Sequence, residues 1–213
     1  MKTMRIKMIL SKRCFFVACI FCLFVYADTY TVFSGETIYR AKIGIQISSQ
    51  NCQFMAKSRD DLRAGDSLRV FIHPEEISFI YIVYSDKKTV RLLSMVKQEK
   101  NSSCFIFPSV EGYYEVDRES HTKVFTIVVS HNELKQVSNL LNSICSYEKW
   151  AEIEKDLIGQ SKLNLSERSD TPLAVAGNVK GGINLEKNDQ IITELPIYSG
   201  KSFLVKKYEF WIK

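Results

Sequence analysis

The chain has 213 residues, of which 46% are hydrophobic and 25% charged, so it can bury a sizeable core. Its 29 basic residues exceed its 24 acidic ones, but residues 1–27 hold five of the basic residues and no acidic one. The remaining 186 residues are therefore balanced in charge. This argues against a nucleic-acid-binding protein, because that class carries a basic surface.

Residues 1–27 are typical of a secretory signal peptide. Five cations precede a charge-free apolar run of 14 residues, Cys14 to Ala27, which ends with small side chains where signal peptidase cuts. A membrane-spanning helix needs about 20 apolar residues, so this run is too short for one. Cleavage after Ala27 predicts a periplasmic or secreted protein. Two alternatives stay open: a signal retained as a membrane anchor, and a lipid attached to Cys19.

The next part of the chain predicts a series of β-strands. Thr37–Ser48 alternates in part between apolar and polar residues, and Gln53–Asp61 is either a strand or an irregular segment. Three strands rich in Val, Ile, Phe and Tyr follow, bounded by turns at residues 65–66, 74–76 and 86–88. These three strands are Ser67–Ile72, Ile77–Tyr84 and Thr89–Leu93.

Residues 95–130 predict a loop, two weak strands and one strong strand. Met95–Ser103 is polar and loop-like, Cys104–Pro108 is a short apolar run that the proline ends, and Tyr113–Val116 pairs weakly. Lys123–Ser130 is apolar on both faces. We therefore expect it to be a central strand that is covered on both sides.

Two helical patterns follow this strand. Glu133–Cys145 has apolar residues at helical spacing, with an N-cap expected among residues 130–132. Tyr147–Ile158 continues with an apolar face, and Gly159 is expected to end it. The sequence allows either two helices separated at residues 142–143 or one bent helix.

The last fifty residues predict a β-rich closing segment. A short strand is possible at Lys162–Leu165, and Pro172–Val179 leads into a hairpin turn at residues 181–182. Ile191–Tyr198 contains Pro196, so we expect an edge strand at best. Ser202–Ile212 is expected to be the closing strand.

Three cysteines follow the predicted cleavage site: Cys52, Cys104 and Cys145. An odd number in an oxidising compartment predicts one disulfide and one free thiol, with the pairing left open. This part of the chain has no Cys-x-x-Cys motif and no histidine at ligand spacing from a cysteine. We therefore predict neither a metal site nor a cofactor.

Residues 54–145 resemble a bacterial envelope family, the domain of unknown function numbered 4384. The matching elements are the entry Leu62–Asp66, the strand Phe79–Tyr84, the pair Phe107-Pro108 and the strand Phe125–Ser130 with the helix start after it. Members of that family look like exported β-rich modules. The resemblance therefore implies an accessory or interaction role, and it carries no catalytic residues onto this chain. Where the family tends to have a small Gly-acid turn, this chain has Ser120–Lys123.

Aromatic residues are the most suggestive candidates for a binding site. Phe79 and Tyr81 share one face of a predicted strand, and Tyr113 and Tyr114 lie near the same predicted sheet. Exposed on one face, these four would form a binding patch for a partner chain or a glycan. The alternative is that they pack in the core.

Catalytic chemistry has weaker support. The three histidines are His73, His121 and His131, and each is more typical of a turn or strand end than of a catalytic triad. Cys145 lies on the apolar face of a predicted helix, which favours burial or a disulfide over a nucleophilic role. We predict no catalytic residues.

These patterns together predict a mainly β, sandwich-like fold with one or two α-helices, which is α+β overall. The expected organisation is a signal at 1–27, a β-rich core at 28–145 and an extension at 146–213 packed on that core. The function that fits is an exported, non-enzymatic binding or assembly module of the bacterial envelope. We expect a protein partner, no nucleic acid, and membrane contact only through a retained signal. Alternatives are a subunit of a larger envelope machine docked through residues 146–213, and an envelope hydrolase.

Overall fold

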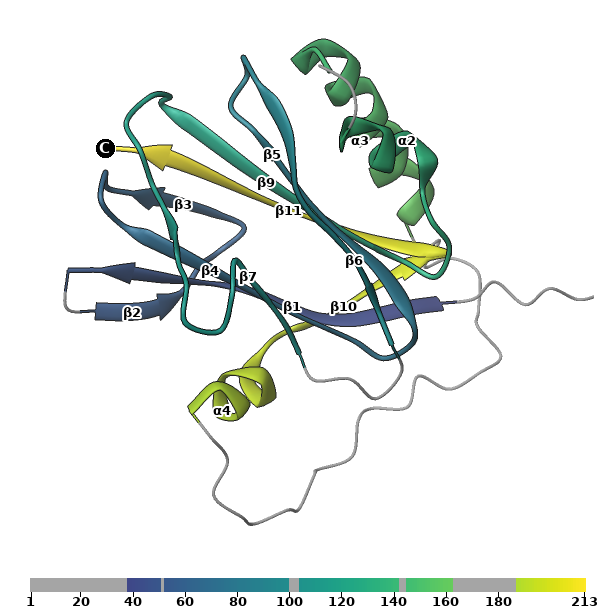
Figure 1. The fold of residues 1–213 in the computed structure, drawn as a ribbon, viewed down its shortest axis with the longest axis horizontal. Helices are drawn as coiled ribbons and strands as arrows, with labels where there is room; N and C mark the ends of the chain where they lie inside the picture. The colour runs from purple at the N-terminus through teal and green to yellow at the C-terminus, as the bar shows by residue number, and fades with distance from the viewer. Residues whose placement is uncertain (1–37, 51, 100–103, 142–144, 163–186) are drawn as a thin grey trace, which may run out of the picture. The chain divides into compact units, whose positions relative to one another are not determined.

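The structure is a computed structural model that describes residues 38–50, 52–99, 104–141, 145–162 and 187–213 (Figure 1). The predicted signal peptide, its cleavage site and the hairpin turn at residues 181–182 lie outside these residues. The described part is mainly β, with two sheets and a few short helices. This confirms the predicted fold class.

Two sheets face each other and form a sandwich (Figure 1). Sheet A has the order β10-β1-β4-β7, with β2 paired to β1 and β8 paired to β4. Its strands are β1 (Ile38–Ser49), β2 (Cys52–Met55), β4 (Ser67–Pro74), β7 (Phe105–Phe107), β8 (Tyr114–Glu115) and β10 (Ile197–Lys201). Neighbouring strands of sheet A run antiparallel to each other.

Sheet B has the order β3-β11-β9-β5-β6. Its strands are β3 (Arg59–Leu62), β5 (Ser78–Ser85), β6 (Val90–Gln98), β9 (Thr122–Ser130) and β11 (Phe203–Ile212). Only the pairing between β3 and β11 is parallel in this sheet. All nine residues of β9 are buried, and β9 lies in the middle of the sheet, which confirms the expected central strand.

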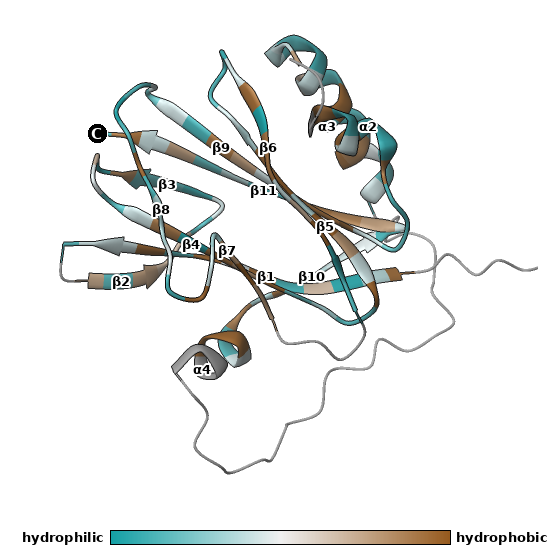
Figure 2. Cartoon of the chain, in the orientation of Figure 1, coloured by the Kyte–Doolittle hydropathy of each residue, from teal (hydrophilic) through white to brown (hydrophobic). Residues whose placement is uncertain are grey.

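Alternation along the strands divides the buried residues into two cores. Ile43, Ile45 and Ile47 of β1 face Ile80, Ile82, Phe125 and Ile127 of sheet B in the core between the sheets. The outer face of sheet B forms a second core with the helices, through Tyr81, Val128, Trp150 and Leu157. Figure 2 shows hydrophobic segments within the strands and hydrophilic residues at turns such as the one between β5 and β6.

The first turns follow the predictions. Gly65 has a φ of +90°, a conformation that side-chain-bearing residues rarely adopt. Beside it, the Asp66 carboxylate accepts a hydrogen bond from the Arg63 backbone N–H at 2.7 Å. Residues 53–61, expected as a strand or an irregular segment, contain two short strands, β2 and β3. Met95–Gln98 belongs to β6 rather than to a loop, because it pairs along β5 as an edge strand that tolerates polar residues.

The helix expected over Glu133–Cys145 is much shorter in the structure. It comprises α2 (Lys135–Ser138) and a 3₁₀ turn, η1 (Asn139–Leu141). Leu134 occupies the N-cap and offers no capping side chain, while the expected cap Ser130 lies in β9. A separate helix, α3 (Tyr147–Ser161), begins where the Ser146 side chain accepts a hydrogen bond from the Lys149 N–H.

The end of α3 also differs from the prediction. The helix runs past Gly159 to Ser161, and its C-cap residue is Lys162. Gly159 is therefore an ordinary helical residue. The possible strand that begins at Lys162 starts at this cap, and the rest of it lies outside the described residues. No described helix is long and apolar enough to cross a membrane.

The C-terminal residues contribute strands to both sheets. Residues before Pro196 form a helix, α4 (Lys187–Glu194), and only those after it form the edge strand β10. β11 lies between β3 and β9 rather than at a sheet edge. Glu36–Lys213 forms one compact unit.

We predict that replacing Phe210 of β11 by Ala lowers the free energy of unfolding by about 3–5 kcal/mol, because Phe210 is fully buried and packs against Phe125. Its neighbour Trp211 points to the other face of the strand and is 39% exposed. The matched Trp211→Ala change should cost less than about 1 kcal/mol. Denaturant unfolding of both variants measures the difference. Equal losses would contradict a buried position for β11.

Candidate functional site

The four predicted aromatic residues do not share a surface. Tyr81 is fully buried beneath the segment around α2, and its hydroxyl accepts a hydrogen bond from the Leu134 N–H at 2.8 Å. Phe79 packs against the same second core. Tyr114 packs between the sheets, with its ring edge-on to Phe125 at a centroid distance of 5.4 Å. Tyr113 alone lies on the outer face of sheet A, over Arg69. The expected aromatic patch is therefore not formed.

The histidines are also far from forming a triad. His131 places Nδ1 3.2 Å from the carbonyl oxygen of Ile77, and the His121 carbonyl accepts a hydrogen bond from the Ile212 N–H. His73 has a buried Nδ1 with no hydrogen-bond partner, and burial, together with Lys42, lowers the pKa of its ring. Within the described ranges, no histidine ring hydrogen-bonds to a hydroxyl, thiol or carboxylate. No described group of three or more His, Cys, Asp or Glu residues has the arrangement of a metal site.

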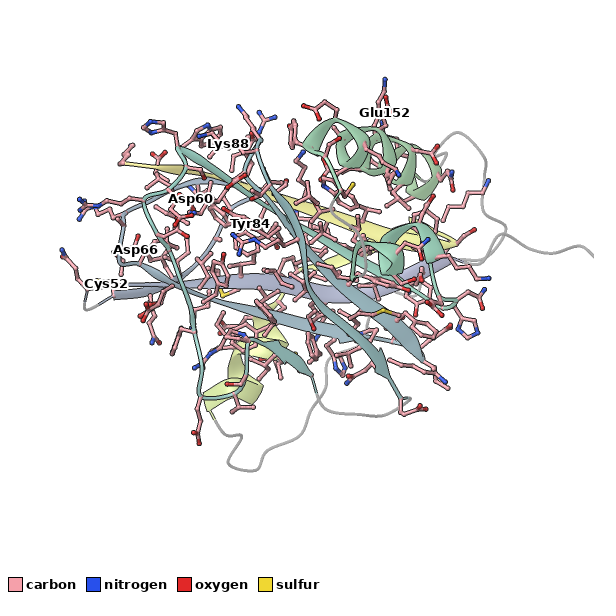
Figure 3. All side chains as sticks on the ribbon, turned by 45° about the horizontal axis from the view of Figure 1, so that its top comes forward. Cys52, Asp60, Asp66, Tyr84, Lys88 and Glu152 are labelled. Atoms are coloured by element: carbon pink, nitrogen blue, oxygen red, sulfur yellow. The ribbon has the colours of Figure 1, made fainter. Side chains whose placement is uncertain are left out.

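All three cysteines are free thiols in the structure, which corrects the expected disulfide. Cys52 is exposed at the β1–β2 hairpin (Figure 3), opposite Ser49. The Cys104 thiol donates a hydrogen bond to the carbonyl of Ile72, whose register partner on β1 is Ile43. Ile43 is six residues from Ser49, which is about 20 Å along a strand. A disulfide needs the two Cα atoms within about 7 Å.

The remaining cysteine environments are not reactive ones. Burial raises the pKa of the Cys104 thiol to about 11, so the nucleophilic thiolate is scarce near neutral pH. Cys145 is buried in the second core beside Trp150, as its position on an apolar face indicated. Neither position therefore supports nucleophilic catalysis.

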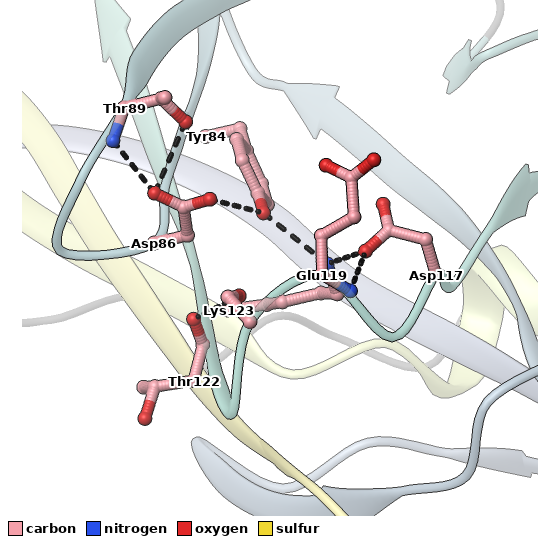
Figure 4. Close-up of polar contacts among 8 residues, drawn as sticks. Tyr84, Asp86, Thr89, Asp117, Glu119, Thr122 and Lys123 are labelled. Carbon is pink, nitrogen blue, oxygen red and sulfur yellow. Dashed lines mark hydrogen bonds and ion pairs between the residues drawn. The ribbon is translucent and has the colours of Figure 1, made fainter.

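A polar network around a buried lysine lies at one end of the sandwich. Lys123 of β9 is fully buried, and its ammonium donates to the Asp117 carboxylate at 2.6 Å and to the Tyr84 hydroxyl at 3.2 Å (Figure 4). The Tyr84 hydroxyl in turn lies 3.4 Å from the Asp86 carboxylate. Asp86 also accepts hydrogen bonds from the Lys88 and Thr89 N–H groups and closes the β5–β6 turn.

Electrostatics show that this network keeps its charges. The hydrogen bond from Lys123 lowers the pKa of Asp117, and burial raises the pKa of Tyr84. Burial opposes the charge on Lys123, but its contacts with Asp117 and Tyr84 prevail and raise its pKa. The ammonium donates to a carboxylate and a phenol, which leaves no free base or nucleophile. We assign the network a structural role, in which it fixes the segment before β9.

Replacing Asp117 by Asn should lower the free energy of unfolding by about 1.5–3 kcal/mol near neutral pH, because the buried ammonium loses its charged partner. Since the folded pKa of Asp117 is lowered, its contribution is full above about pH 4 and is lost as the pH falls through the folded value. The gap between wild type and variant should therefore shrink in acid. Urea unfolding across that pH range measures it, and a gap independent of pH would contradict the ion pair.

A second buried polar contact attaches α3 to sheet B. Glu154 is nearly buried, accepts a hydrogen bond from the Thr126 hydroxyl of β9, and accepts another from the Lys207 ammonium of β11 at 2.6 Å. Two strands and one helix are thereby joined at one carboxylate. Both of its oxygens are engaged, so Glu154 is also a structural residue.

The outer face of sheet A offers a different arrangement, centred on Arg69. Arg69 lies on β4 between the inward-facing Leu68 and Val70, and only 7% of its surface is exposed. Its Nε donates to the Gly112 carbonyl at 3.2 Å, and its guanidinium carbon lies 3.9 Å from the centre of the Tyr113 ring. Guanidinium groups are well suited to stacking on aromatic faces.

The segment that covers Arg69 has a defined shape. The Gly112 N–H donates to the Ser109 hydroxyl at 2.8 Å, which folds residues 109–112 into a turn and directs the Gly112 carbonyl to Arg69. A Cβ at Gly112 would lie 2.6 Å from the Ser109 oxygen, so a glycine suits this position. The Tyr113 hydroxyl accepts a hydrogen bond from Gln53 of β2 at 3.4 Å. The Tyr113 side chain is thus held by Arg69 at its ring and by Gln53 at its hydroxyl.

Four further residues join Arg69 on this face. Gln46 of β1 is the register partner of Arg69, and Met55 of β2 is the register partner of Gln46. Ile197 of β10 pairs with Lys42, which lies on the same face of β1 as Gln46. Met55 is 39% exposed and Ile197 46%. We name this surface the Arg69 face; it comprises Gln46, Met55, Arg69, Tyr113 and Ile197.

The Arg69 face was not predicted from the sequence, although part of its signal is there. Alternation in the strand that contains Leu68, Arg69 and Val70 places the arginine opposite the core. Its association with Tyr113 depends on the pairing of β8 with β4, which no local pattern reveals. The face carries one cation and several apolar groups but no base or nucleophile, so it suits binding rather than a reaction.

Comparison with known proteins gives no relative for this arrangement. No protein-family model matches the chain. No curated protein and no solved structure matches it either.

Proposed function

We propose that this chain is an exported, non-enzymatic binding module of the bacterial cell envelope that holds a protein partner on its Arg69 face. Three features of the sequence support export and this role: the signal-like residues 1–27, the balanced charge of the rest, and the resemblance to domain family 4384. A partner chain, rather than nucleic acid or a substrate, accounts best for a face that combines apolar and guanidinium groups.

The observation that carries the proposal is the contrast between the interior and this face. Inside, Lys123 and Glu154 are both held in ion pairs. Outside, Met55 and Ile197 are two of five large apolar side chains exposed in the described residues, and both lie on the same face of sheet A. Exposed apolar groups beside Arg and Tyr are the composition of protein–protein interfaces.

The edge of sheet A adds to the case. β2 has four exposed residues, including Phe54, and among the described strands it pairs only with β1. Such an edge offers unpaired backbone groups next to the Arg69 face. A partner that lies across this face therefore has both side-chain and main-chain contacts available. The alternative docking surface, residues 146–213 as an appendage, is not favoured, because β11 is built into sheet B.

A photo-crosslinking amino acid at position 197 tests the proposal in cells that make the protein naturally. We expect one discrete crosslinked product containing a second protein. The same probe at Lys88, exposed in the β5–β6 turn, is the control and should give none. Met55→Lys should remove most of the product, because a charge then enters the apolar part of the interface. No product at 197, or equal products at both positions, would reject the Arg69 face as the binding surface.

Export makes a separate prediction about the N-terminus. Mass spectrometry of the protein from the same cells should show a chain that begins at Asp28, in the periplasmic or secreted fraction. A lipidated N-terminal Cys19 would show that the protein is membrane-anchored. An intact Met1 in the cytosolic fraction would overturn the assignment to the envelope.

A further inference from the structure

Arg69 carries a charge that nothing in the described residues neutralises. Its partners among the described residues are the Gly112 carbonyl, which accepts a hydrogen bond from Nε, and the Tyr113 ring. No carboxylate in the described part of the chain forms an ion pair with it. Among the other buried charged residues, Lys123 and Glu154 each have an oppositely charged partner at 2.6 Å, whereas the Asp66 carboxylate accepts a hydrogen bond from the Arg63 backbone N–H.

A nearly buried guanidinium without a counter-charge is costly. Removing a charge from water is unfavourable unless an opposite charge or several hydrogen bonds replace the water. A guanidinium group has five N–H donors. In Arg69 the Nε–H donates to the Gly112 carbonyl, which leaves the four donors on the two Nη atoms. The two Nη atoms have no hydrogen-bond partner among the described residues. They are not fully buried either, so a ligand can reach them.

Gln46 supplies a second set of unused polar groups at the same place. It is only 7% exposed, and its side-chain amide has no hydrogen bond to a described residue. As register partners on adjacent strands, Gln46 and Arg69 have neighbouring side chains on one face. An amide N–H and a guanidinium edge together match the two oxygens of a carboxylate.

We infer that Arg69 and Gln46 form the recognition point for a carboxylate of the partner protein. This inference rests on the proposed function and names the chemistry that its surface selects. Charge complementarity favours an acidic group, and the adjacent apolar groups favour a peptide segment over a small anion. Phosphate and other inorganic anions would gain nothing from Met55, which lies two strands from Arg69, a distance of about 10 Å.

The spacing defines the kind of segment that fits. An extended chain advances about 3.3 Å per residue, so about 10 Å corresponds to roughly three residues. The partner segment should therefore present an acidic group with an apolar side chain two to four residues away. The acidic group is either a Glu or Asp side chain or the carboxylate at a chain end, and the experiment separates these two sources.

The test uses NMR titration of the purified protein with short peptide probes in a chloride-free buffer. The probes are acetyl-Leu-Ala-Ala-Glu-amide, its Gln counterpart, and acetyl-Leu-Ala-Ala-Leu with a free C-terminus. The signals are the Arg69 Nε–H and the Gly112 and Tyr113 amides. We expect saturable shifts with a carboxylate probe and none with the Gln probe. The Glu probe identifies a side-chain source, and the free C-terminus identifies a chain end.

Two arginine variants give the matched comparison. Arg69→Lys keeps the charge but loses the planar fork, and we expect about tenfold or greater loss of probe affinity. Arg91→Lys is the control, because Arg91 also lies over a tyrosine, with 5.7 Å between its guanidinium carbon and the Tyr84 ring centre, but on β6. It should leave affinity unchanged. If Arg69→Lys does not fold, the wild-type comparison of Glu and Gln probes decides alone.

The outcomes separate this inference from the proposed function. Absence of saturable shifts with both carboxylate probes, or equal shifts with the Gln probe, overturns the carboxylate site. If the crosslinked partner at position 197 persists in that case, the binding module stands without this chemistry. If a carboxylate probe binds but no partner is crosslinked, the recognition point stands and the protein-binding role fails.

Discussion

The fold depends on one strand that is buried on both faces. All nine residues of β9 are buried, so one layer must cover each side of sheet B. Sheet A covers the inner side, and α2 and α3 cover the outer side. Two of the four polar residues on β9 show how strict this burial is. Lys123 faces inward and binds Asp117, whereas Thr126 faces outward and donates to Glu154 of α3.

These matched pairs make Arg69 stand out. Lys123 and Glu154 are each paired with an opposite charge, whereas the Arg69 guanidinium is nearly buried, stacked on Tyr113 and open at its Nη atoms. The turn at residues 109–112 supports it with a directed carbonyl. Such positioning lowers the cost of ordering a contact when a partner arrives, because the side chain is already held in place. Its exposed apolar neighbours extend the same surface.

The fold was predictable where burial imposes a local pattern. Apolar runs and alternation identified β9, β5 and β1, because each crosses the core along most of its length. Prediction failed where distant contacts decide the outcome. Helical spacing continued from residue 133 to 145, but Ser146 caps a new helix and α2 ends after one turn. Residues before Pro196 alternate weakly, yet α4 forms there instead of a strand.

The functional residues were harder to predict than the fold. Tyr81 and Tyr114 looked like binding residues because aromatic groups serve both cores and interfaces, and only packing distinguishes the two uses. Arg69 shows the opposite error, because it was not predicted as a binding residue. A single arginine in an otherwise apolar strand gave no reason to single it out. Its environment comes from Gln46 of β1 and from Gly112 and Tyr113, so two segments far from Arg69 in the sequence form it.

The place of β11 in sheet B has a consequence for biosynthesis. β3 and β9 are made early but are joined only through this late strand. Sheet B therefore cannot close while residues 203–212 are still inside the ribosome. Until these residues have been made, β3 has no partner in sheet B and β9 lacks one of its two neighbouring strands.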